Sequence, residues 1–237
     1  MTWLPNPSHR IQLVYTPAGK GTPKGLFVSH VIIELVQKLV GEILMLTETT
    51  AITPVKMASS SSLITGEELA AMGDIGRTEL VKGEIIHLMP TGHPHSFYEG
   101  NITIALGIFV RQHQLGRVLP GEVGIYTHRQ PDTVRGADVA FISHQRLAQV
   151  QSKSFLDVCP ELIVEVMSPA DTWSEVHEKL EEYFAVSAQL IWVVDPHRQR
   201  LHIYRSLTDL EILTHQDTLT GGEVLPGFQV PVAELFT

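Results

Sequence analysis

The sequence predicts a mixed α/β domain, in which helices cover both faces of a central sheet. The segments 162–167 (LIVEVM) and 190–194 (LIWVV) are almost continuously apolar, as strands in the middle of a covered sheet are. Segments with the apolar period of helices alternate with these strands along the chain. The chain has 237 residues, of which 43% are hydrophobic and 18% charged, so it can bury a sizeable core.

The domain boundary is predicted near residue 60, which leaves an N-terminal extension over residues 1–60 and the α/β domain over residues 61–237. The start of the extension is rich in proline and glycine and has no sustained periodicity. Residues 31–46 predict one amphipathic helix, with apolar residues at four-residue spacing: Val31, Leu35, Leu39 and Ile43. A Thr/Ser-rich linker follows over residues 47–62, and this shift in composition sets the boundary.

The first half of the domain predicts a helix, a hairpin and a long helix. Thr65 and Glu68 form a capping box that opens the first, short helix. Residues 79–89 (ELVKGEIIHLM) predict two short strands around a turn at Lys82-Gly83. Residues 95–114 predict the long helix, because apolar residues recur on one of its faces: Ile102, Leu106, Phe109 and Val110.

The second half adds most of the sheet. Strands are predicted over residues 118–126, 137–142, 162–167, 190–194 and 201–205. A second capping box, formed by Thr172 and Glu175, opens a helix with an apolar face: Trp173, Val176, Leu180, Tyr183 and Phe184. Asp195-Pro196 predicts a turn that ends a strand, and residues 230–236 (VPVAELF) predict a closing helix.

Composition narrows the classes of function. The formal net charge is −9, whereas a protein held on nucleic acid by broad phosphate neutralisation is basic. Any contact with nucleic acid must therefore rest on bound metal and on a local basic strip, for which Arg129 and Arg135 are candidates unless they only solvate their loop. No apolar run reaches the length of a membrane span, and the single cysteine, Cys159, fits a reducing cytoplasm.

Two acidic residues interrupt otherwise apolar strands. Glu165 lies within ELIVEVM, and Asp138 lies within ADVAFI. A buried carboxylate without a partner costs several kcal/mol, so it takes up a proton or finds a cation. Two such acids on neighbouring strands predict a hard divalent cation between them, such as Mg²⁺ or Mn²⁺. The alternative for each acid by itself is a strand-end carboxylate that accepts hydrogen bonds from a loop.

Lys179 is a candidate partner for this pair of acids. It flanks the apolar stripe of the helix that begins just after the Glu165 strand, so it can reach back toward Glu165. The alternative is a solvated lysine in the charged run EKLEE that pairs with Glu175 or Glu182, and periodicity by itself favours this alternative.

From about Thr65 to Phe236 the chain resembles the Uma-two family of restriction endonucleases, within the PD-(D/E)XK nuclease superfamily. The resemblance rests on the order and spacing of these segments: ELVKGEIIHLMPTGHPHS, GEVGIY, PDTVRGADVAFIS, CPELIVEVMSPAD, EKLEEY, IWVVDPHRQRLHIYR and LPGFQVPVAELF. It implies a restriction-endonuclease-like fold, with a mixed central sheet flanked by helices. It also implies a nuclease that uses Mg²⁺ or Mn²⁺.

The resemblance implies roles for particular residues. Asp138 and Glu165 match the metal ligands, and the backbone carbonyl of Val166 could be a further ligand. The superfamily places a lysine two residues after the glutamate, where this chain has Met167. Members of the Uma-two family commonly have an apolar residue there and a basic residue on the next helix, which Lys179 matches.

Three further residues are supporting candidates. Glu84 matches a recurrent family acid and could hold the metal through water, or it is an exposed acid after a hairpin turn. His95 matches a family position near a helix start, where it could touch phosphate; with His93 it makes only a weak zinc signal. Glu122 could shape the site from the strand before Asp138, or it is structural.

These observations lead to three hypotheses of function. The first is a metal-dependent endonuclease that hydrolyses DNA phosphodiester bonds as a homodimer, since an isolated domain cuts one strand per site. The second is a catalytically degenerate nuclease fold that serves as a nucleic-acid or protein binding module, which the acidic balance and Met167 support. The third is a metal-dependent hydrolase of a small substrate.

Overall fold

The computed structural model describes residues 63–237, so the helix expected over residues 31–46 and the boundary near residue 60 lie outside the described residues. The helices are α2 (Gly66–Ala71), α3 (His93–His113), α4 (His144–Leu147), α5 (Trp173–Ala185) and α6 (Val232–Leu235). The strands are β1 (Thr78–Val81), β2 (Glu84–His87), β3 (Gly116–His128), β4 (Thr133–Ser143), β5 (Leu162–Val166), β6 (Leu190–Asp195), β7 (Arg200–Tyr204), β8 (Leu210–Leu213), β9 (Thr218–Gly221) and β10 (Leu225–Pro231).

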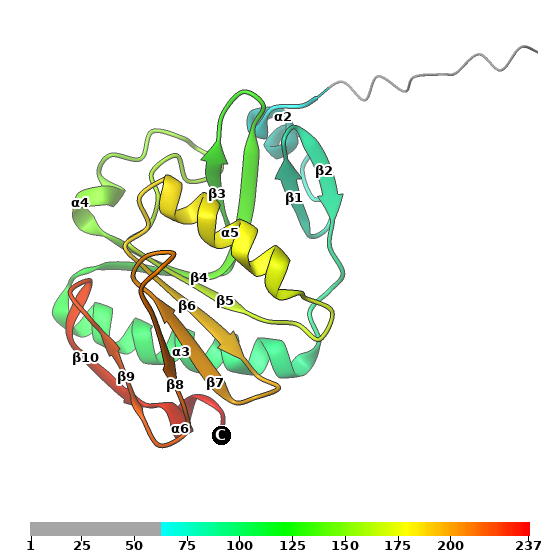
Figure 1. Cartoon of the computed structure of the whole chain (residues 1–237). Coiled ribbons are helices and arrows are strands. Elements are labelled where there is room, and N and C mark those ends of the chain that lie inside the picture. Colours follow the sequence, from blue (N-terminus) through cyan, green and yellow to red (C-terminus); the bar gives the residue numbers. More distant parts are fainter. Residues whose placement is uncertain (1–62) are drawn as a thin grey trace, which may run out of the picture. The chain divides into compact units, whose positions relative to one another are not determined.

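A mixed sheet forms the centre of the domain (Figure 1). Its strand order is β2-β1-β4-β5-β6-β7-β8, and β3 pairs with β4 off this path. The neighbours β5 and β6 run parallel, while β4 runs antiparallel to β5, β1 and β3. Strands β9 and β10 form a separate two-stranded sheet. The predicted mixed α/β class is therefore confirmed.

Helices α3 and α5 cover opposite faces of this sheet, as Figure 1 shows. Alternate side chains of β5 enter two different apolar clusters. Val164 joins the cluster that contains Leu106 of α3, whereas Ile163 joins the cluster that contains Leu180 of α5. Glu165 lies two residues after Ile163, so its side chain faces α5.

Both predicted capping boxes are present. At the start of α5 the Thr172 side chain accepts a hydrogen bond from the Glu175 amide, and Glu175 accepts one from the Thr172 amide at 2.8 Å. The same arrangement joins Thr65 and Glu68 at the start of α2. The box begins α5 just beyond the end of β5, which directs this helix back over the sheet.

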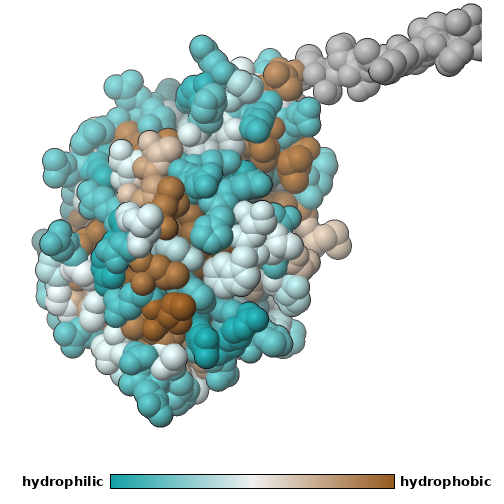
Figure 2. Space-filling view, viewed as in Figure 1, coloured by the Kyte–Doolittle hydropathy of each residue, from teal (hydrophilic) through white to brown (hydrophobic). Residues whose placement is uncertain are grey.

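The surface seen in Figure 2 is mostly hydrophilic, with separate apolar groups between the polar ones. Exposed apolar residues include Leu210 and Ile212 of β8, the last strand of the main sheet. These two residues are two positions apart and therefore lie on the same face of the strand. No helix within residues 63–237 has both the length and the apolar character needed to cross a membrane.

Candidate metal and catalytic site

The two strand acids lie next to each other on neighbouring strands. Val139 of β4 pairs with Val164 of β5, so Asp138 and Glu165 flank this pair on the two antiparallel strands. An oxygen of Asp138, Oδ2, accepts a hydrogen bond from the Val166 amide at 2.6 Å. Asp138 is 5% exposed and Glu165 is 9% exposed, so two carboxylates are buried close together.

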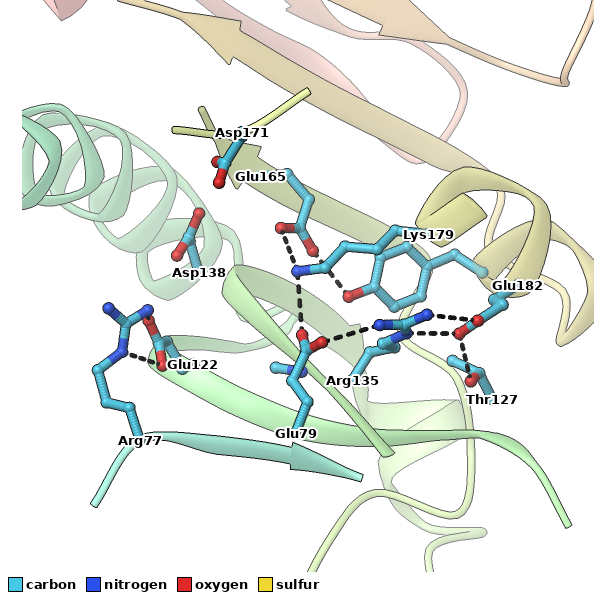
Figure 3. Close-up of polar contacts among 12 residues, drawn as sticks. Arg77, Glu79, Glu122, Thr127, Arg135, Asp138, Glu165, Asp171, Lys179 and Glu182 are labelled. Carbon is cyan, nitrogen blue, oxygen red and sulfur yellow. Dashed lines mark hydrogen bonds and ion pairs between the residues drawn. The ribbon is translucent and has the colours of Figure 1, made fainter. Parts of the chain in front are cut away.

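Lys179 reaches Glu165 of this pair from helix α5 (Figure 3). Its Nζ lies 3.1 Å from Glu165 Oε2 and 3.0 Å from Glu79 Oε1. The alternative, in which Lys179 pairs with Glu175 or Glu182, is wrong. Glu175 is engaged in the cap of α5, and Glu182 binds Arg135. The lysine therefore joins two buried acids from different strands.

Tyr183 is a site residue that the sequence did not single out. Its hydroxyl donates a hydrogen bond to Glu165 Oε1 at 2.7 Å. Lys179 and Tyr183 are four residues apart, so they share one face of α5 and together engage both oxygens of Glu165. The four-residue spacing predicts that the two side chains lie close together, but the same periodicity also places Tyr183 on the apolar face of the helix.

The electrostatic balance at Glu165 favours a proton or a cation. Burial is the largest influence and raises the pKa of this carboxyl, and the nearby charge of Asp138 raises it as well. The ammonium of Lys179 acts in the opposite direction, and the resulting pKa is about 7. The protein therefore does not fully compensate the two negative charges of Asp138 and Glu165.

Glu79 is the second residue that the sequence did not single out. Its Oε2 accepts a hydrogen bond from Arg135 Nη1 at 2.9 Å, and Arg135 forms two further bonds to Glu182 at 2.7 and 2.8 Å. Glu182 also accepts a bond from Thr127. Burial raises the pKa of Glu79, but the charges of Lys179 and Arg135 outweigh it and lower the pKa overall. We call Glu79, Arg135, Glu182 and Lys179 the ion-pair network.

His95 lies on the other side of Asp138. Its Nε2 is 3.4 Å from Asp138 Oδ2, and its Nδ1 is 4.0 Å from Glu99 Oε2. Burial lowers the pKa of His95, but the hydrogen bond and charge of Asp138 outweigh this effect and raise it. We call His95, Glu99, Asp138 and Glu165 the acidic cluster. His95 is buried against Asp138, a position that the sequence did not predict.

The other two supporting candidates lie outside this arrangement. Glu84 is exposed at the turn of the β1–β2 hairpin, where it pairs with Val81, so the structure favours its alternative as a surface acid. Glu122 forms an ion pair with Arg77 and has a left-handed backbone, with φ of 61°. Its side chain is therefore paired with a neighbouring cation, and this contact favours the alternative of a structural residue.

The structure also bears on Arg129 and Arg135, the two candidates for a basic strip. Arg135 is buried and its guanidinium is engaged by Glu79 and Glu182, so its assignment to a phosphate-binding strip is wrong. The guanidinium of Arg129 lies 3.3 Å from the centre of the Tyr126 ring and pairs with Glu67. These contacts fit a role of Arg129 in holding its loop.

Met167 occupies the position where the superfamily has a lysine. It is half-buried and packs against the apolar cluster beneath α5. Its amide donates a hydrogen bond to the carbonyl of Val194, which continues the pairing of β5 with β6. The position therefore serves packing, and the lysine next to Glu165 comes from α5.

Comparison with known proteins gives a similar fold and a family for this chain. A structure described as a putative nuclease belonging to DUF820, from Anabaena variabilis, has a similar fold with a TM-score of 0.61 and 18% sequence identity. The match covers 73% of this chain and 97% of that one. A search of the curated proteins found no match. Residues 67–233 match the Uma2 family, described as putative restriction endonuclease, and the chain therefore belongs to the Uma2 family.

Proposed function

We propose that the chain is a Mg²⁺- or Mn²⁺-dependent endonuclease that hydrolyses DNA phosphodiester bonds through a nuclease domain over residues 61–237. The observation that carries the proposal is the contact of Lys179 Nζ with Glu165 Oε2 at 3.1 Å. A lysine from α5 thereby takes the place of the one missing at position 167, next to Glu165, whose strand neighbours that of Asp138. Membership of the Uma2 family supports the same assignment.

The residues present fit a divalent cation. Asp138 and Glu165 would hold it, with the backbone carbonyl of Val166 as a further ligand. Both carboxylates are buried, and burial together with the nearby charge of Asp138 raises the pKa of Glu165 despite the Lys179 ammonium. Hard divalent ions bind carboxylate oxygens in such places. A bound ion would supply acidification of the attacking water and neutralisation of charge on the phosphate.

The side chains around Glu165 define the remaining chemistry. The Tyr183 hydroxyl and the Lys179 ammonium each hold one oxygen of Glu165, which fixes the orientation of this carboxylate. Lys179 would also orient the attacking water or stabilise the phosphate oxygens as negative charge develops on them. The Asp138 carboxylate is held by the Val166 amide, so both acids are positioned before any substrate binds.

DNA cleavage tests this proposal directly. Supercoiled plasmid is incubated with the purified chain and Mg²⁺ or Mn²⁺, beside Asp138→Ala and the matched control Asp209→Ala, an exposed acid on a distant loop. The wild type and Asp209→Ala should nick the plasmid, while Asp138→Ala should not. Equal cutting by all three proteins would reveal a contaminant, and a wild type that does not cut would overturn the proposal.

The assembly that we propose is a homodimer, because one site of this kind cuts one strand of a duplex. Sedimentation measurements at several protein concentrations test this assembly. A chain that stays monomeric on DNA and still makes double-strand breaks in one encounter would contradict the proposed dimer.

A binding module is the second candidate, and one contact favours it. The Lys179 ammonium lies between the carboxylates of Glu79 and Glu165, so its charge is already neutralised in the protein. The net charge of −9 also disfavours strong attraction of DNA. This candidate predicts no cleavage with either metal but metal-independent retardation of DNA in a gel. A screen of small phosphoesters tests the third hypothesis, a hydrolase of small substrates.

A further inference from the structure

His95 is held between two carboxylates, with Nε2 facing Asp138 and Nδ1 facing Glu99. The residue is 7% exposed, so water does not fully solvate its ring. The separations of 3.4 Å to Asp138 and 4.0 Å to Glu99 exceed the usual length of a nitrogen–oxygen hydrogen bond, about 2.7–3.2 Å. Among the described residues 63–237, buried Nδ1 finds no hydrogen-bond partner. A buried polar atom without a partner is costly, and a ligand would remove that cost.

Backbone amides hold the two carboxylates in place. The Gly121 amide donates to Glu99 Oε1 at 3.0 Å, which leaves Oε2 facing the histidine ring. The Val166 amide donates to Asp138 Oδ2 at 2.6 Å. One ligand atom from each of His95, Glu99 and Asp138 lies within 4.8 Å of the others. Metal–ligand bonds are about 2.0–2.2 Å long, so two ligand atoms on one ion lie up to about 4.4 Å apart, close to the upper limit of these separations.

We propose that His95, Glu99 and Asp138 bind a divalent transition-metal ion, in a position distinct from that between Asp138 and Glu165. The inference rests on the proposed function, because the two positions share Asp138, and it names a second ion for the same site. A donor set with one imidazole selects Mn²⁺, Co²⁺ or Zn²⁺, whereas Mg²⁺ prefers oxygen ligands and water. Mg²⁺ would therefore occupy the Glu165 position and leave the His95 position to transition metals.

The competing interpretation is a purely ionic one. In that case His95 is a cation that neutralises Asp138 and Glu99, and it never coordinates a metal. The two interpretations differ in one observable, the nitrogen bound to the ion. Magnetic coupling between Mn²⁺ and a histidine nitrogen arises only when the nitrogen is a ligand or nearly so.

Manganese binding to the full chain separates these interpretations. The protein is freed of metal with a chelator and titrated with Mn²⁺, while electron paramagnetic resonance counts the bound ions. The wild type should bind two ions per chain. His95→Ala should bind the second ion at least about tenfold more weakly than the wild type does. His177→Ala, an exposed histidine on α5, is the matched control and should behave as the wild type.

Pulsed resonance on the loaded protein supplies the spectroscopic signature. The wild type should show coupling to a histidine nitrogen, which changes on ¹⁵N-histidine labelling and disappears in His95→Ala. Excess Mg²⁺ should displace the other ion and leave the nitrogen-coupled one. If His95→Ala does not fold, loss of the nitrogen-coupled ion in Glu99→Gln decides the question. A wild type without nitrogen coupling overturns the inference and leaves His95 as a cation.

Glu165→Gln distinguishes this inference from the proposed function. This variant should lose cleavage with Mg²⁺ and keep the nitrogen-coupled Mn²⁺ ion. A wild type that holds that ion but does not cut DNA would contradict the nuclease proposal and leave the metal position intact. If the wild type cuts DNA but shows no nitrogen coupling, the nuclease proposal stands and the His95 metal position is contradicted.

Discussion

The ion-pair network and the acidic cluster meet at Lys179, and both bury acidic side chains in the same domain. In the ion-pair network each carboxylate has a cationic partner, with Glu79 held by both Arg135 and Lys179. In the acidic cluster Asp138 accepts a backbone amide and lies 3.4 Å from His95, while Lys179 is the cation at Glu165. The pKa shifts follow the same division, since the pKa of Glu79 is lowered and that of Glu165 is raised.

The opposite pKa shifts of Glu79 and Glu165 show that burial of an acid does not by itself mark a functional residue. Burial raises the pKa of both Glu79 and Glu165, and the number of nearby cations decides which effect prevails. Removing one member of the compensated network leaves a buried charge unpaired, whereas the partly compensated pair of acids can accept a cation from solution. Substitution of Arg135 should therefore affect folding, whereas substitutions in the cluster, or of Lys179 that contacts both groups, should affect activity.

The largest effect is expected for Asp138→Asn. The amide keeps an oxygen for the Val166 amide but loses the charge that would hold the metal. Cleavage should fall by more than about a thousandfold, equivalent to about 4 kcal/mol, while the free energy of unfolding changes by less than about 1 kcal/mol. Plasmid nicking rates and urea unfolding measure the two quantities. A variant that unfolds but keeps its specific activity would reverse the assignment of the two regions.

The next effect concerns Arg135→Met, in the ion-pair network. The substitution leaves the half-buried Glu182 without its cation and removes one partner of the buried Glu79. Breaking such a buried pair should lower the free energy of unfolding by about 3 kcal/mol. Arg205→Ala, at exposed ion pairs with Asp209 and Glu211, is the control and should cost less than about 1 kcal/mol. Equal losses for the two variants would argue against a structural role for the network.

A smaller loss of activity is expected for Lys179→Met. If Lys179 replaces the missing superfamily lysine, cleavage should fall about a hundredfold, which corresponds to about 2.7 kcal/mol. Adding Met167→Lys to this variant should restore about tenfold of the lost rate, because it returns a lysine to the strand that carries Glu165. Single-turnover rates check both values. No recovery in a double variant that folds normally would weaken the assignment of Lys179.

The smallest effect is a pH dependence of stability in the metal-free protein. The pKa of Glu165 rises from 4.5 to about 7 on folding, so its stabilising contribution is complete below pH 4.5 and is lost as pH rises through 7. Glu165→Gln removes this titration. Relative to wild type, the variant should gain about 1–3 kcal/mol between pH 4.5 and pH 8. Urea unfolding in the presence of chelator measures the gain, and a difference independent of pH would contradict it.

Local patterns were sufficient to predict most of the elements. The capping box at Thr172 and the turn at Lys82-Gly83 depend on residues adjacent in sequence, and the structure confirms both. The apolar strands around Asp138 and Glu165 are also confirmed, with both acids buried. Hydrophobic periodicity carries this information because the side-chain period of a strand or helix is a property of the backbone itself.

Local patterns could not predict which side chains contact each other between different strands and helices. Glu79 and Glu84 lie in one hairpin motif, ELVKGE, and no periodicity separates them. Pairing of Leu80 with Val134 brings β1 next to β4, which places Glu79 beside Arg135 and leaves Glu84 exposed at the turn. The buried state of Arg135 has the same origin, since its partners come from β1 and α5.

Three features could be predicted from the sequence alone: the α/β class, the order of the elements, and the position of two acids within apolar strands. Each of them depends on residues that are neighbours along the chain. Only the tertiary structure decided that Lys179 and Tyr183 engage Glu165 and that His95 lies against Asp138. These contacts depend on strand register and on where each helix packs, and many weak contacts between distant segments set both. The charge balance that separates the acidic cluster from the ion-pair network exists only once those segments meet.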